Sequence, residues 1–199
     1  MNTTTQTETP QTESPEVLSA CYAREPISGN HSLIELPLKG KINFRGDPEN
    51  ATVLDTIKQA TELDLPVTAN SSSQNSNTTI YWLGPDEWQI TCSLSKVAEI
   101  TTAIHSALDG IHHSAVDVSD YYTTLQLESR KSAEILSRGT PLDLHPSVFP
   151  AGSFAQTRYG HASVLLHKLS DVPVFEIQIR WSYAEYVWDY LDSTIQMLD

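Results

Sequence analysis

The chain has 199 residues, of which 39% are hydrophobic and 19% charged, and this length is enough for one compact domain. Its formal net charge is −13, because 25 acidic residues outnumber 12 Lys and Arg residues. The Lys and Arg residues do not cluster. This excess of negative charge excludes a nucleic-acid partner and an anionic membrane surface, because both attract basic proteins.

Two cysteines, Cys21 and Cys92, lie far apart, and neither belongs to a CxxC pair. This spacing fits neither structural zinc nor a redox dithiol, and it favours a reducing compartment with both thiols free. The N-terminal sequence shows no basic segment followed by an apolar one, and no apolar run reaches the length of a membrane span. We therefore expect a cytoplasmic protein without a membrane partner.

Residues 1–15 are dominated by Thr, Gln, Glu, Ser and Pro, which predicts a disordered tail. In chain order, strands are predicted at 33–36, 41–44, 79–83, 88–91, 115–118, 122–127, 154–159, 163–167 and 174–179. Helices are predicted at 48–63, 95–109, 131–136 and from 182 towards the C-terminus. The run 70–77 is almost entirely Ser and Asn, which indicates a solvated loop.

The order strand, strand, helix recurs along the chain, and helices are too few for a doubly wound parallel sheet. Hairpin-like neighbouring strands favour antiparallel pairing. The predicted fold class is therefore α+β, with antiparallel or mixed sheets and packed helices. Residues 16–199 are expected to form a single domain, or two sub-domains, 16–110 and 111–199, that share a core.

Residues 138–150 are the most distinctive part of the sequence. Pro141 and Pro146 bracket an alternating Leu-Asp-Leu-His run and bias the residues before them away from helix. These features predict an extended, stiffened loop with leucines on one side and Asp143 and His145 on the other. Such a loop has no obvious catalytic function and is typical of a surface that a partner binds.

By residue type alone, Asp143, His145 and Ser147 suggest a catalytic triad. In an extended segment, neighbours two residues apart lie roughly 7 Å from each other, beyond hydrogen-bond distance. We therefore expect these three residues to fix the loop or to contact a partner. His112 and His113 could be half of a metal site, but adjacent strand residues point to opposite faces, so a solvated turn is the preferred interpretation.

The sequence contains no Gly-rich phosphate loop, no G-x-S-x-G string and no H-E-x-x-H string. The sequence therefore does not indicate a phosphate-binding loop, an activated serine nucleophile or a zinc site on a helix. We predict no catalytic, cofactor-binding or metal-binding residue in this chain.

Aromatic residues crowd the C-terminal end. Five of them lie within ten residues, namely Trp181, Tyr183, Tyr186, Trp188 and Tyr190. This is more aromatic surface than one small helix usually buries, and such a surplus is typical of interface cores, although ordinary core packing stays open. Together with the proline-rich loop, this region gives a candidate subunit interface of Leu142, Leu144, His145, Phe149, Trp181 and Trp188.

Several strings are specific enough to compare with known families. They are LGPDEW at 83–88, VDVS at 116–119, GTPLDLHPSVFP at 139–150, AQT at 155–157 and RWSYAEYVW at 180–188. Through them the chain resembles the gamma subunit of heterotetrameric sarcosine oxidase, over about 79–191 and weakly over 17–63. It departs from the family at Thr140, where cysteine is common, and at Arg130-Lys131, where Gly-Pro is common; neither position has a known catalytic role.

The resemblance implies a fold similar to the folate-binding domain of the glycine-cleavage T-protein, in a non-catalytic subunit that binds no cofactor itself. Complexes of this family convert sarcosine, O2 and tetrahydrofolate into glycine, hydrogen peroxide and 5,10-methylenetetrahydrofolate. FAD, FMN, NAD, tetrahydrofolate and zinc are implied for the other subunits. The gamma chain is implied to dock mainly on alpha, in a complex that also holds beta and delta.

Other functions stay open. A similar gamma subunit occurs in complexes that oxidise other N-methylated amino acids, such as N-methylglutamate dehydrogenase, and the sequence does not separate them. A free-standing folate-binding protein of T-protein type is a second alternative, but the Lys-Gly-Cys-x-x-Gly-Gln motif of the related iron–sulfur maintenance proteins is absent. A third is an unrelated binding module that uses the 139–150 loop for a small acid.

Overall fold

The computed structural model describes residues 19–198, so the tail predicted at 1–15 lies outside the described residues. Its strands are β1 (His31–Glu35), β2 (Gly40–Arg45), β3 (Ser72–Gln74), β4 (Thr79–Gly84), β5 (Glu87–Cys92), β6 (Ser114–Asp117), β7 (Tyr122–Ser129), β8 (Phe154–Tyr159), β9 (Ala162–Lys168) and β10 (Val174–Arg180). Its α-helices are α1 (Ala51–Thr61), α2 (Val97–Ala107), α3 (Ser132–Ser137) and α4 (Ala184–Leu198).

The strands form two five-stranded sheets, with the orders β1-β7-β10-β9-β8 (sheet A) and β3-β4-β5-β2-β6 (sheet B). All pairings between these described strands are antiparallel, which agrees with the predicted α+β class. β1 pairs with β7, and β6 pairs with β2, so each sheet takes a strand from the other side of residue 110. The sheets therefore do not divide the chain at that residue, and the expected domain organisation stays a prediction.

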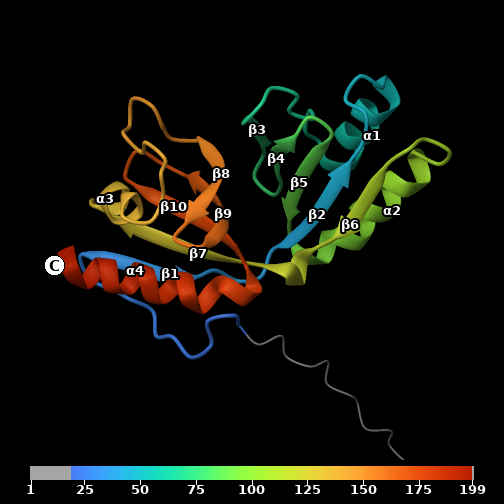
Figure 1. Ribbon diagram of the computed structural model, residues 1–199. Helices are drawn as coiled ribbons and strands as arrows, with labels where there is room; N and C mark the ends of the chain where they lie inside the picture. Colours follow the sequence, from blue (N-terminus) through green and yellow to red (C-terminus); the bar gives the residue numbers. More distant parts are fainter. Residues whose placement is uncertain (1–18, 199) are drawn as a thin grey trace, which may run out of the picture.

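Sheet B carries its apolar side chains on the face that α1 and α2 cover, on the side away from sheet A (Figure 1). Alternation along β5 explains this, because Trp88 and Ile90 point towards the helices while Gln89 and Thr91 point away. The indole of Trp88 is fully buried, and its Nε1 donates to the carbonyl of Pro66 at 2.7 Å. One apolar core therefore lies between sheet B and its two helices.

Sheet A has a second core, against α4, which runs along the bottom of the view beside β1 (Figure 1). The contacting strand residues are Leu125, Leu127, Val164, Leu166, Phe175, Ile177 and Ile179, and α4 contributes Ala184, Val187, Trp188, Leu191 and Ile195. Helical spacing puts these α4 residues on one stripe, as an amphipathic helix requires. Among residues 19–198, no helix combines the length and apolarity that a membrane crossing requires.

Two local predictions differ from the structure. The first helix begins at Ala51 rather than at Pro48, because Asn50 is its N-cap and accepts a hydrogen bond from the Thr52 amide at 2.9 Å. The solvated loop expected at 70–77 contains the short strand β3, which pairs with β4. An edge strand gains its backbone hydrogen bonds without apolar side chains, so a Ser- and Asn-rich sequence gave no signal for it.

Candidate functional site

The proline-rich loop begins where α3 ends, and its entry is fixed by a close backbone approach. A Cβ at Gly139 would lie 2.4 Å from the ring of Tyr159, and the Gly139 carbonyl accepts from the Gly160 amide at 2.8 Å. Further along, the hydroxyls of Thr140 and Thr157 lie 3.0 Å apart. The loop is therefore fastened to the β8–β9 hairpin before its prolines begin.

Two of the predicted interface residues in this loop are core residues. Leu144 is 4% exposed and Phe149 is 7% exposed, and the ring of Phe149 stacks on Phe175 of β10. The chain bends here, because the amides of Val148 and Phe149 both donate to the His145 carbonyl. This bend turns Phe149 into the core of sheet A, so both side chains are buried within this chain, and their contact with a partner stays a prediction.

The prediction that the side chains of Asp143, His145 and Ser147 lie beyond hydrogen-bond distance of one another is wrong for His145 and Ser147. Nδ1 of His145 is 2.7 Å from the hydroxyl of Ser147, and a carboxylate oxygen of Asp143 accepts from the backbone amide of His145 at 2.9 Å. The carboxylate therefore caps the backbone instead of orienting the imidazole, unlike the base–orienter pair of a triad. All three side chains are exposed, and their geometry fixes the bend.

The aromatic residues of the C-terminal region divide into buried and exposed ones. Trp188, 3% exposed, belongs to the sheet A core. Trp181 is half-buried, whereas Tyr183 and Tyr186 are 40% and 39% exposed. Of the six predicted interface residues, Leu142, His145 and Trp181 keep accessible side chains, and their contact with a partner stays a prediction.

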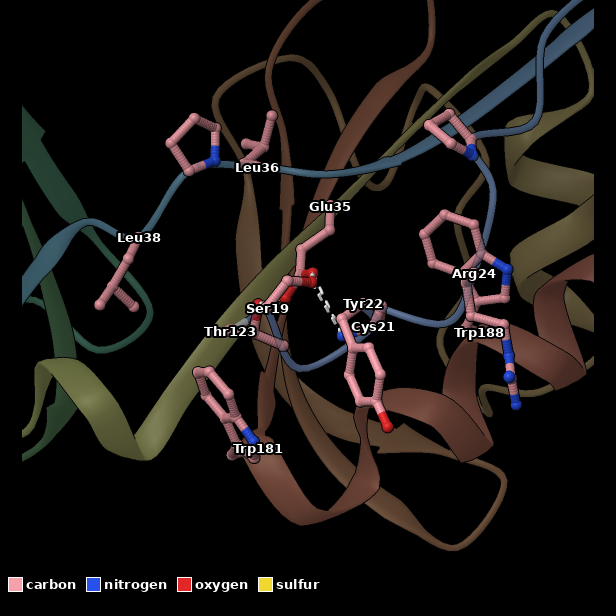
Figure 2. A pocket seen from close by; sticks show the side chains of 12 residues that line it. Ser19, Cys21, Tyr22, Arg24, Glu35, Leu36, Leu38, Thr123, Trp181 and Trp188 are labelled. Carbon is pink, nitrogen blue, oxygen red and sulfur yellow. Dashed lines mark hydrogen bonds between the residues drawn. The ribbon is translucent and has the colours of Figure 1, made fainter. Parts of the chain in front are cut away.

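A cavity of about 480 Å³ lies where the chain from Ser19 passes the end of β1, and the aromatic rings of Trp181 and Trp188 line it (Figure 2). Glu35 points into this region and accepts hydrogen bonds from the amides of Ala20 and Cys21, both at 3.2 Å. Its carboxylate also accepts from the hydroxyls of Ser19 and Thr123. These donors occupy the carboxylate, which holds the 19–21 turn against sheet A.

Cys21, also in this cavity, is buried, and burial together with the negative charge of Glu35 raises the pKa of its thiol to about 12. A thiol with such a pKa stays protonated at neutral pH and is a poor nucleophile. The sequence singled out neither Glu35 nor this cavity. Only the fold brings β1 beside β7 and so places Glu35 next to Thr123.

The inner faces of the two sheets meet through a small apolar cluster of Tyr81, Phe154 and Leu165 and, beside it, through a polar layer. This polar layer, the inter-sheet seam, comprises Lys39, Lys41, Tyr81, Gln89, His167, Glu176 and Gln178. Nε2 of Gln89 donates to Gln178 at 2.5 Å, and the Tyr81 hydroxyl lies 2.9 Å from Nδ1 of His167. Burial lowers the pKa of His167, so its imidazole is kept neutral and can accept from the tyrosine. Each of these bonds joins a strand of sheet B to a strand of sheet A.

The two lysines of the seam have different kinds of partner. Lys39 and Glu176 form an ion pair at 3.0 Å. Lys41 is 1% exposed, and within residues 19–198 its amine has only long contacts, to the carbonyls of Tyr122 and Lys39 at 3.4 and 3.5 Å. Burial lowers the pKa of Lys41 to about 8.

Beside the seam, a cavity of about 450 Å³ is lined by residues that include Gln89, Gln178 and the exposed guanidinium groups of Arg158 and Arg180.

Comparison with known proteins gives a consistent result along the chain. The family model that matches is the sarcosine oxidase, gamma subunit family, over residues 45–196. A curated relative named sarcosine oxidase subunit gamma, from Corynebacterium sp. (strain U-96), is 26% identical over 177 residues, which is 87% of this chain and 84% of the relative. A second relative of that name, from Corynebacterium sp. (strain P-1), is 24% identical over 179 residues, with 88% and 85% covered.

Two solved structures show the fold. Heterotetrameric sarcosine oxidase from Corynebacterium sp. U-96, in complex with pyrrole 2-carboxylate, contains a chain with a TM-score of 0.78 and 24% identity, covering 86% of this chain and 88% of that one. The glycine cleavage system aminomethyltransferase T from Bartonella henselae matches with a TM-score of 0.57 and 12% identity, covering 81% of this chain and 46% of that one. The predicted similarity of fold to the T-protein is confirmed.

Proposed function

Because the chain belongs to the sarcosine oxidase gamma subunit family, we propose that it is the gamma subunit of a heterotetrameric sarcosine oxidase. It contributes no catalytic residue and docks mainly on the alpha subunit, in a complex with beta and delta. The complex converts sarcosine, O2 and tetrahydrofolate into glycine, hydrogen peroxide and 5,10-methylenetetrahydrofolate. FAD, FMN, NAD, tetrahydrofolate and zinc are held by the other subunits.

Similarity along almost the whole chain is the observation that supports this function most. The curated gamma subunits align with 87–88% of the chain, and the family model extends from Arg45, the last residue of β2, to Gln196 in the last turn of α4. Such coverage includes both sheets and both cores, so the similarity belongs to the entire subunit and not to one shared module.

The local chemistry supports a structural role. The carboxylate of Asp143 is engaged by the backbone of His145, and the thiol of Cys21 is held in its protonated form. The residue types of a hydrolytic or thiol site are thus present in geometries that stabilise a bend and a turn. Asp143 thus serves the stability of the proline-rich loop, and through it the shape of the docking surface.

A cytoplasmic location accompanies this function. Cys21 and Cys92 are both free and both buried, which fits a reducing compartment. Detection of the complex in the cytosolic fraction of the source cell tests this location, and recovery from an oxidising compartment contradicts it.

Docking can be tested with a pair of valines of matched exposure. Val148 lies in the proline-rich loop and is 60% exposed, while Val67 lies between α1 and β3 and is 59% exposed. The chain is co-expressed with its neighbouring genes, and the purified complex is examined by native mass spectrometry. We expect Val148→Asp to reduce the fraction of gamma retained in the complex, and Val67→Asp to leave it unchanged.

The same preparation tests the reaction. The wild-type complex is expected to oxidise sarcosine in preference to N-methylglutamate, and a complex assembled without gamma is expected to be unstable and poorly active. Preference for N-methylglutamate assigns the chain to the related dehydrogenase instead. Sarcosine turnover by the purified gamma chain alone, or equal retention of both valine variants, contradicts the proposal at its catalytic or its docking step respectively.

A further inference from the structure

Two histidines form a close pair at the C-terminal end of α2, a helix that covers sheet B and contains none of the candidate interface residues. His105 lies in the last turn of α2, and His113 lies in the connection to β6. Nδ1 of His105 is 2.9 Å from Nε2 of His113, and the ring centroids are 5.0 Å apart. His105 is exposed and His113 is half-buried, so the pair is open to solvent.

Backbone carbonyls determine where the imidazole hydrogens lie. Nε2 of His105 is 3.0 Å from the carbonyl of Ala115, and Nδ1 of His113 is 2.7 Å from the carbonyl of Ile111. A carbonyl only accepts, so each of these outer nitrogens carries a hydrogen, and a neutral imidazole has just one. The two nitrogens that face each other at 2.9 Å therefore both present lone pairs, an arrangement that a cation between them stabilises.

This is also how histidine ligands of metal ions are held, since a ligating imidazole usually donates its other N–H to a carbonyl or carboxylate that fixes the ring. We propose that His105 and His113 form a two-imidazole binding site for a divalent first-row transition metal ion. Imidazole suits zinc, copper and nickel, whereas magnesium and calcium prefer oxygen ligands. The site is independent of the proposed function of the subunit.

The spacing requires only a small adjustment. Zinc bound at about 2.0–2.1 Å from each nitrogen in tetrahedral geometry places those nitrogens about 3.3 Å apart. The observed 2.9 Å reaches this value through a slight rotation of the exposed His105 ring. Within residues 19–198 no group of three or more His, Cys, Asp and Glu side chains could hold a metal ion. Water or a side chain from another subunit therefore completes the coordination.

Zinc titration of the untagged, full-length, chelator-treated chain tests the site. A chromophoric competitor reports the affinity, and we expect one zinc ion per chain, with no competition from excess Mg²⁺. His105→Gln and His113→Gln are each expected to weaken binding at least about tenfold, as loss of ligand support does in other sites. His112→Gln is the matched control: it removes an exposed histidine beside the pair, changes no formal charge of the chain and is expected to keep wild-type affinity.

A second measurement uses the wild-type chain and does not depend on the folding of any variant. In ¹⁵N spectra of the imidazoles, one equivalent of Zn²⁺ is expected to shift Nδ1 of His105 and Nε2 of His113, and to leave His112 unmoved. Equal affinities for wild type, His105→Gln and His113→Gln overturn the proposal. So do imidazole signals that zinc does not move, because the pair then holds a shared proton and no metal.

Discussion

The two faces of β5 are both buried, but chemically different side chains pack against them. Trp88 points into the apolar core beneath α1 and α2, while the next residue, Gln89, points into the inter-sheet seam. Both side chains are almost fully buried, yet Trp88 is surrounded by apolar side chains and Gln89 by hydrogen-bonding partners. The helix-covered faces supply most of the hydrophobic stabilisation, whereas the seam fixes how one sheet lies on the other.

A polar seam fixes that placement because its bonds form in only one arrangement. Sliding of one sheet over the other would leave the amides of Gln89 and Gln178 and the pair of Tyr81 and His167 without partners. Each unpaired buried group costs about 1–3 kcal/mol. Apolar side chains at the same positions tolerate such sliding far better. A subunit that must present one rigid surface to a larger complex benefits from this difference.

The largest effect is expected at the helix-covered face. Trp88→Ala should lower the free energy of unfolding by about 3–5 kcal/mol, because it opens a large cavity and removes the donor to the Pro66 carbonyl. Denaturant unfolding of the chain, followed by circular dichroism, measures the loss. Trp88→Phe is the control, which keeps much of the packing and should lose clearly less. A loss below about 1 kcal/mol for the alanine variant contradicts the assignment of this face as the main source of stability.

In the seam, Lys41→Met should raise stability at pH 7 by about 1–3 kcal/mol. Burial lowers the pKa of Lys41 from 10.5 to about 8, so at pH 7 the amine is still mostly charged, and holding that charge costs the folded chain stability relative to the unfolded chain. A shift of this size corresponds to at most roughly 3 kcal/mol. The long contacts of the amine to two carbonyls offset little of this cost.

The pH dependence gives a sharper form of the same test. Between pH 8 and 10.5 the unfolded chain binds more protons at Lys41 than the folded chain does, so this residue makes stability rise with pH across that window. The difference between wild type and Lys41→Met isolates the contribution from other groups that titrate there. Lys58→Met, at an exposed lysine, should leave the rise intact. A wild-type curve parallel to that of Lys41→Met contradicts the burial cost.

Much of the fold could be predicted from the sequence, and the reason is periodicity. Alternation in segments such as 88–91 and 174–179, and helical spacing at 95–109, place strands and helices without knowledge of their neighbours. Long-range pairing is different. Nothing local indicates that β1 joins β7 or that β6 joins β2, and the cavity at Glu35 and the seam both depend on those pairings.

The shape of the proline-rich loop was less predictable, for a related reason. The sequence predicts a straight, extended loop, whereas the bend at His145 turns Phe149 into the core, where Leu144 is buried too. Aromatic surplus likewise does not distinguish Trp188, which is buried, from Tyr186, which is exposed. The sequence did contain a signal for the seam, namely polar residues at alternate positions of otherwise apolar strands, as at Gln89, Thr91 and Gln178.

The smallest effect, and the most specific, is expected from the two glutamines of the seam. Gln89→Leu alone should destabilise the chain by about 1–2 kcal/mol, because it leaves the buried Oε1 of Gln178 without its donor. The double variant Gln89→Leu, Gln178→Leu removes donor and acceptor together and should stay within about 0.5 kcal/mol of wild type. A double-mutant cycle by denaturant unfolding measures the coupling between the two positions. Strictly additive losses contradict a direct bond.

With stability nearly restored, the double variant should still bind co-expressed partners less tightly than wild type, because its sheets are held together without a bond that fixes their register.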